Sequence, residues 1–80
     1  MSKLINQPVE LSRENNFPAA FCYQRPYRIK YILNHWREMG QWWLQEPELF
    51  VYEVSTDYSL CELHYLPREE RWILYRLGNC

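Results

Sequence analysis

Aromatic and basic side chains alternate through one stretch of the chain, and together they could bind a polyanion or a protein. The stretch comprises Tyr23, Arg25, Tyr27, Arg28, Lys30, Tyr31, His35, Trp36, Arg37, Trp42 and Trp43. Bases of single-stranded nucleic acid stack on such rings while the cations meet phosphates. Trp, Tyr and Arg also dominate the binding energy of protein interfaces. A plainer interpretation is a core with an ordinary solvated surface, and the sequence leaves all three open.

Two adjacent tryptophans, Trp42 and Trp43, are the most specific indication of a site. Successive side chains of an extended chain point to opposite faces, so both rings cannot point inward. One of them is therefore expected to face solvent or to cover a sheet edge. The candidate residues for binding protein or nucleic acid are Trp42, Trp43, Arg25, Arg28, Arg37 and His35.

The residue patterns that support catalysis are missing from the sequence. The glycines, Gly40 and Gly78, are too few for a phosphate-binding loop. Carboxylate pairs at 46/48 and 69/70 fall in expected turns, where solvated charge is the default, whereas acid–base catalysis needs a shielded site. We therefore expect a protein without enzymatic activity and without catalytic residues.

Histidine and cysteine do not occur at the spacings that are typical of metal sites. Neither C-x-x-C nor H-x-x-H is present. A metal site assembled across strands from Cys22, Cys61 and His64, or a nucleophilic Cys–His pair, is the alternative to core thiols and a surface imidazole. We expect the plainer arrangement, with no metal and no cofactor.

Length and charge describe one small domain with segregated charges. The chain has 80 residues, 48% of them hydrophobic, and a net charge of −1. Four basic residues and no acids lie in 25–37, whereas eight acids and one base lie in 38–70. The near-neutral total does not by itself indicate a polyanionic partner.

Cysteine usage bears on the compartment. Three cysteines, an odd number at wide spacings, follow an N-terminus that lacks a secretory signal. We expect a cytoplasmic protein with free thiols, in which Cys22 and Cys61 are buried and Cys80 is exposed. Because no apolar run is long enough to span a bilayer, we expect no membrane association.

Alternating apolar residues predict six short strands joined by tight turns. The strands are expected at 9–13, 19–23, 27–36, 49–55, 60–66 and 72–77. Residues 1–8 are predicted to be a disordered N-terminus, 9–78 a single β domain and 79–80 a tail. The segment 27–36 also fits helical spacing, but its β-branched and aromatic residues favour a strand that bends near Asn34.

The predicted fold is all-β, a small antiparallel meander curled into an SH3-like, partly open barrel. Strands 9–13 and 72–77 are expected to be edges that could pair between subunits, giving a monomer or a weak homodimer. The expected core comprises Phe21, Ile29, Leu33, Trp36, Val54, Leu63, Trp72 and Leu74.

Several of these pieces resemble a small bacterial family of unknown function. The resemblance covers about residues 18–77, and its most specific part is the pattern W-x-x-x-G-x-W-W, formed here by Trp36, Gly40, Trp42 and Trp43. Members of that family occur near, or fused to, Y-family translesion DNA polymerase subunits. The family's first turn is a W-R-G-R hairpin, whereas this chain has Tyr23-Gln24-Arg25-Pro26.

The resemblance implies an accessory role in DNA damage tolerance and carries over no catalytic residues. Our functional hypothesis is therefore a binding module with a protein partner, for which a DNA polymerase subunit is one candidate. The alternative is a weak binder of single-stranded DNA that uses the same aromatic and basic surface.

Overall fold

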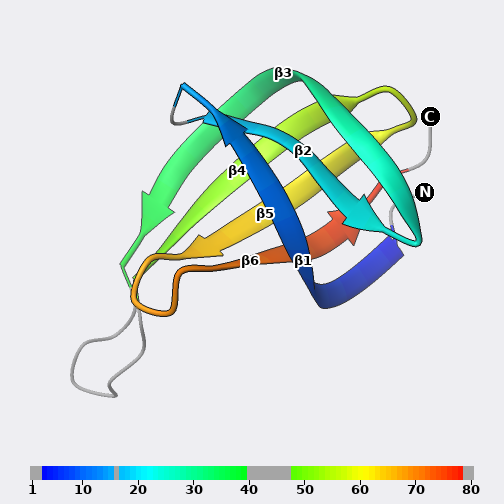
Figure 1. The fold of residues 1–80 in the computed structure, drawn as a ribbon. Coiled ribbons are helices and arrows are strands. Elements are labelled where there is room, and N and C mark those ends of the chain that lie inside the picture. The colour runs from blue at the N-terminus through cyan, green and yellow to red at the C-terminus, as the bar shows by residue number, and fades with distance from the viewer. Residues whose placement is uncertain (1–2, 16, 40–47, 79–80) are drawn as a thin grey trace.

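The computed structural model describes residues 3–15, 17–39 and 48–78, and it is all-β, as predicted. Six antiparallel strands follow one another around a closed barrel (Figure 1). The strands are β1 (Lys3–Glu14), β2 (Phe17–Tyr23), β3 (Arg25–Glu38), β4 (Leu49–Thr56), β5 (Leu60–Leu66) and β6 (Arg71–Leu77).

Strand β1 closes the barrel because it changes partner along its length. Its first half, Lys3 to Val9, pairs with β6, and its second half, from Glu10, pairs with β2. The register shifts between Leu4 and Gln7, where Asn6 adopts a positive φ of 51°. A bulge of this kind bends a strand and increases its twist, which lets one strand serve two neighbours.

This closure corrects three details of the sequence-based prediction. The barrel is closed rather than partly open. The N-terminus predicted to be disordered up to residue 8 is in β1 from Lys3 onward. The two strands expected to be free edges pair with each other, for example at Val9 and Trp72, so neither offers that edge to a second subunit.

Strand β3 is the longest element, and the strand prediction for 27–36 is confirmed. Its first four residues pair with β2. From Ile29 to Glu38 it pairs with β4, with register shifts between Ile29 and Tyr31 and between Ile32 and Asn34. The second shift lies where the sequence predicted a bend.

The core confirms five of the eight predicted residues, namely Phe21, Val54, Leu63, Trp72 and Leu74, all of which are buried. Ile29 is half-buried and packs against this cluster. Leu33 and Trp36 were wrongly placed in the core, since they are 57% and 36% exposed. Both lie in the half of β3 that β2 does not reach, so neither is covered.

The two cysteines within the described residues, Cys22 and Cys61, differ in burial, and Cys80 lies outside those residues. Cys61 is buried, as predicted, but Cys22 is exposed. Phe21 points into the core and is 2% exposed. Side chains alternate along a strand, so Cys22 must point outward. Among the described residues, no helix is long and apolar enough to cross a membrane.

One buried hydroxyl organises the turn between β4 and β5. The Oγ1 of Thr56 donates to the carbonyl of Ser59 at 2.7 Å. The same oxygen accepts hydrogen bonds from the backbone N–H groups of Tyr58, at 3.2 Å, and Ser59, at 3.0 Å. Thr56 is 7% exposed, so these groups have little access to water.

Replacing this hydroxyl is expected to destabilise the protein. Thr56→Ala leaves buried backbone donors without their acceptor, at a cost of about 1–3 kcal/mol, whereas Thr56→Ser keeps the oxygen and most of the stability. Urea unfolding followed by tryptophan fluorescence measures the difference. Equal losses for the two variants would show that the methyl group, not the hydroxyl, matters.

Candidate functional site

Two of the predicted site residues, Arg25 and Arg28, lie beside the β4–β5 turn. The Arg25 guanidinium sits over the Tyr58 ring, 3.6 Å from its centroid. The backbone N–H of Arg28 donates to Asp57 Oδ1 at 3.1 Å, and the Arg28 carbonyl accepts from the Asp57 N–H at 3.1 Å. Both residues therefore tie the start of β3 to this turn.

Tyr27 completes the aromatic packing at this end of the barrel. Its ring stacks on Phe21 at 5.0 Å and meets the edge of Tyr58 at 5.5 Å. Burial raises the pKa of the Tyr27 hydroxyl, with a smaller contribution from Cys61. This end is thus closed by rings and by the contacts of Arg25.

The other predicted residues lie at the far end of β3. His35 and Arg37 are exposed and pair with Tyr52 and Phe50 of β4. Arg25 and Arg37 are twelve positions apart on one strand, a path of about 40 Å at 3.3 Å per residue. The basic candidates therefore divide between the two ends of the barrel. Trp42 and Trp43 lie outside the described residues.

A series of aromatic rings extends inward from His35 across the far end of the barrel. The His35 ring stacks on Tyr52 at 5.9 Å, and Tyr52 meets Trp72 at 5.4 Å. Trp72 contacts Tyr65 at 4.7 Å, and Tyr65 meets Phe50 at 6.4 Å. Four strands, from β3 to β6, thus contribute to one surface, which we call the aromatic mouth (His35, Phe50, Tyr52, Tyr65 and Trp72).

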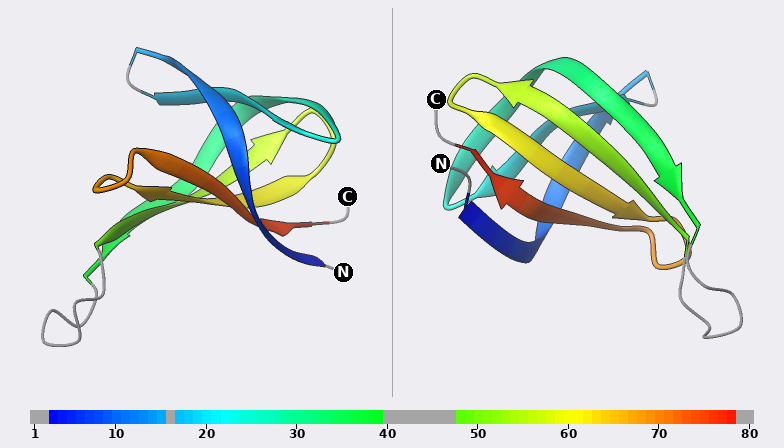
Figure 2. Two further views of the ribbon diagram at one scale, coloured as in Figure 1. Left: turned by 60° about the horizontal axis from the view of Figure 1, so that its bottom comes forward. Right: turned by 180° about the vertical axis from the view of Figure 1, so that it is seen from behind.

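Arg13 adds a cation to the aromatic mouth and was missed by the sequence analysis. Its guanidinium lies 4.7 Å from the Tyr65 centroid and 5.5 Å from that of Trp72. The alternation of Val9, Leu11 and Arg13 was the available signal, since it places all three on one face of β1. Figure 2 shows the β1–β2 hairpin diverging from the other four strands at this end.

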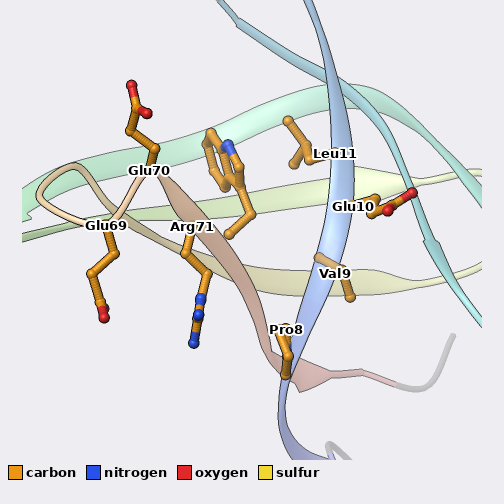
Figure 3. A pocket seen from close by; sticks show the side chains of 8 residues that line it. Pro8, Val9, Glu10, Leu11, Glu69, Glu70 and Arg71 are labelled. Atoms are coloured by element: carbon orange, nitrogen blue, oxygen red, sulfur yellow. The ribbon is translucent and has the colours of Figure 1, made fainter.

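A hollow of about 470 Å³ lies beside Trp72, where β1 parts from β6. Its rim includes Glu10, Glu69, Glu70 and Arg71. Glu69 and Glu70 point in opposite directions (Figure 3), so their carboxylates do not converge on a shared position. The hollow is therefore a gap between strands, and Glu69 and Glu70 on its rim are not arranged as a pair for acid–base chemistry.

Among the described residues, the second half of β3 has a paired strand on one side only. Its pairing with β2 ends at Arg28, and from Ile29 onward its ladder is with β4. Among the described residues no strand pairs with the opposite side of 30–38. This stretch, which we call the open edge, also carries large exposed apolar side chains: Tyr31 at 68%, Leu33 at 57% and Trp36 at 36%.

Trp36 lies on the outer face of the sheet, away from the aromatic mouth. It pairs with Val51, which in turn pairs with His64 of β5. Val51 is 1% exposed although it points away from the core that contains Val54. The Trp36 indole N–H donates to Glu38 Oε1 at 3.1 Å. Trp36 therefore belongs to a small apolar row on the outside of the barrel.

His64, Cys22 and Cys61, which the sequence offered as an alternative metal site, lie apart in the described structure. The His64 Nε2 lies 2.6 Å from Glu62 Oε2, and its ring stacks on Tyr75 at 4.3 Å. Cys61 is buried on the opposite face of β5, and Cys22 is exposed on β2. Within residues 3–15, 17–39 and 48–78 no three His, Cys, Asp or Glu side chains are placed to hold a metal ion.

Comparisons with protein-family models, with curated proteins and with solved structures find no match to this chain. The family resemblance drawn from residues 18–77 therefore stays a prediction. The aromatic mouth and the open edge are the surfaces that could bind a partner, and the predicted site residues His35 and Arg37 lie on them.

The packing of Arg25 on Tyr58 predicts a structural effect of its removal. Arg25→Ala should lower stability by about 0.5–1 kcal/mol, because a cation–π contact at an exposed position is lost. Arg28→Ala is the matched control, since the Arg28 hydrogen bonds described here are made by its backbone. Chemical denaturation compares the two variants. A loss for Arg28→Ala equal to that for Arg25→Ala would contradict the prediction.

Proposed function

We propose that this protein is a non-enzymatic interaction module that binds a protein partner through the second half of β3. The observation that supports it most directly is the open edge, residues 30–38, which has a strand on one side only and exposed Tyr31, Leu33 and Trp36. Exposed apolar side chains grouped on one element mark interaction surfaces in water-soluble proteins.

The residue types at this surface suit a protein interface. Trp36 and Arg37 are adjacent, and Arg37 pairs with Phe50 of the aromatic mouth. Aromatic and arginine side chains dominate interface energetics. Met39, 67% exposed, extends the apolar surface beyond β3. Methionine is flexible and polarizable, and it adapts to partners of differing shape.

The family resemblance suggests the context in which such a module acts. We propose a cytoplasmic accessory role in DNA damage tolerance, with a Y-family translesion polymerase subunit as the partner. The free thiol of Cys22 fits a reducing compartment. Trp42 and Trp43 follow β3 in the sequence and remain proposed contacts of the same partner.

Charge placed on the open edge should weaken partner binding. Leu33→Asp is expected to reduce affinity for the polymerase subunit by about tenfold or more, because burying a leucine contributes about 1.5–3 kcal/mol. Calorimetry or biolayer interferometry with the purified subunit measures the change.

The control for that variant is Leu60→Asp on β5. Leu60 is 52% exposed, close to the 57% of Leu33, but lies on β5, with β4 between it and the open edge. If both variants bind the polymerase subunit with the same affinity as the unmodified protein, the proposal that β3 contacts the subunit would be overturned. A subunit that does not bind at all would overturn the proposed partner.

The aromatic mouth favours a second function, binding of single-stranded nucleic acid. Aromatic rings packed on one another lie there beside Arg13 and Arg37. Bases stack on rings while arginines contact phosphates. Within this proposal the contacts are few, so the affinity is weak and depends on low salt.

Labelled single-stranded DNA distinguishes this second function from the first. Titration at low salt should quench the tryptophan fluorescence, and moderate salt should reverse the quenching. Arg13→Ala should weaken binding, whereas Arg68→Ala, in the turn between β5 and β6, should not. The absence of quenching at low salt, where phosphate contacts are strongest, would remove nucleic acid as a ligand.

A further inference from the structure

We propose that the open edge of β3 binds an extended acidic segment of the partner, which adds to the sheet as a further strand. This inference rests on the proposed protein-interaction function and specifies the conformation and the charge of the partner. An added strand satisfies the backbone groups of a sheet edge, and its alternate side chains meet the surface on either side.

The backbone of the open edge has groups available for such a strand. From Ile29 to Glu38 the ladder of β3 is with β4, and the far side of the strand has no paired strand among the described residues. The N–H of His35 donates to the Asn34 side chain, Oδ1, at 2.9 Å, in an exposed position. The Asn34 oxygen thus accepts from a backbone N–H that a neighbouring strand would otherwise pair with. A backbone carbonyl of the partner can replace this oxygen.

The charge of the open edge selects an acidic partner. Lys30 and Arg37 are exposed on this stretch and outnumber its single acid, Glu38 at the end of β3, and from Arg25 to Arg37 the chain contains no acid. Opposite charges placed across neighbouring strands stabilise the pairing, whereas like charges destabilise it. Tyr31, Leu33 and Trp36 lie between Lys30 and Arg37 and provide contacts for apolar residues. The complementary segment therefore alternates acidic and apolar residues.

A second copy of this chain fits the open edge less well than an acidic peptide. Antiparallel self-pairing would place two copies of 30–38 side by side. It would also bring together both register shifts, between Ile29 and Tyr31 and between Ile32 and Asn34, from each copy. Bulges of this kind are a device that keeps sheet edges from pairing with one another. A short flexible segment adapts to them more readily than a strand fixed in a barrel.

Two synthetic peptides of alternating sequence test the proposal, one of Glu and Val and one of Lys and Val. Amide hydrogen exchange of the full chain, measured with each peptide, reports where an added strand forms. The Glu–Val peptide should bind in a salt-sensitive manner and protect amides within 30–38, and the Lys–Val peptide should bind at least about tenfold more weakly.

Charge reversal on β3 provides a control whose outcome depends on the peptide lying along residues 30–38. Lys30→Glu combined with Arg37→Glu, both at exposed positions, should reverse the preference so that the Lys–Val peptide binds more tightly. Arg68→Glu, in the turn between β5 and β6, adds an acid elsewhere and should leave the preference for the Glu–Val peptide unchanged. Circular dichroism and urea unfolding confirm that each variant is folded.

Four results would overturn the inference: protection outside 30–38, equal binding of both peptides, no binding of either peptide, or a dimer that protects 30–38 without peptide. The last would identify a second copy as the occupant. Binding of the purified polymerase subunit tests the proposed function separately. Loss of subunit binding in Leu33→Asp with no peptide binding would mean that side chains, and not an added strand, make the contact.

Discussion

The length of β2 is the constraint on which the rest of the structure depends. β2 has seven residues and lies between β1, with twelve, and β3, with fourteen. It can therefore cover only part of each neighbour. β3 pairs with it through Arg28 and then continues for ten residues against β4 alone. One end of the barrel is closed as a result, and the other is left with an aromatic mouth and an open edge.

The two ends use similar residue types for different purposes. At the closed end Arg25 packs on Tyr58, and Tyr27 stacks on Phe21, so the cation and the rings stabilise the turns. At the open end His35 and Arg37 lie on an uncovered strand beside Tyr52 and Phe50. Composition alone does not distinguish these roles. The distinction comes from whether a neighbouring strand is long enough to cover the side chains.

The same constraint explains what the sequence could and could not predict. Alternation along a strand assigns each residue to a face, and this identified Phe21, Val54 and Leu63 as core. It does not give the length of the neighbouring strand, so Leu33 and Trp36 were assigned to the core although they are exposed. The alternation of residues also did not predict that the barrel closes, because the polar segment of β1 before Pro8 forms its ladder with β6 through backbone groups.

An edge as exposed as that of β3 is a hazard that proteins ordinarily reduce with charges and bulges. β3 has both, in Lys30 and in two register shifts along 29–34. The register shifts act most strongly against a copy of the same strand, because it repeats the same bulges. A partner of opposite charge makes attractive contacts with Lys30 and Arg37. In our proposal the bulges therefore disfavour self-pairing, and the two cations favour an acidic strand over a basic one.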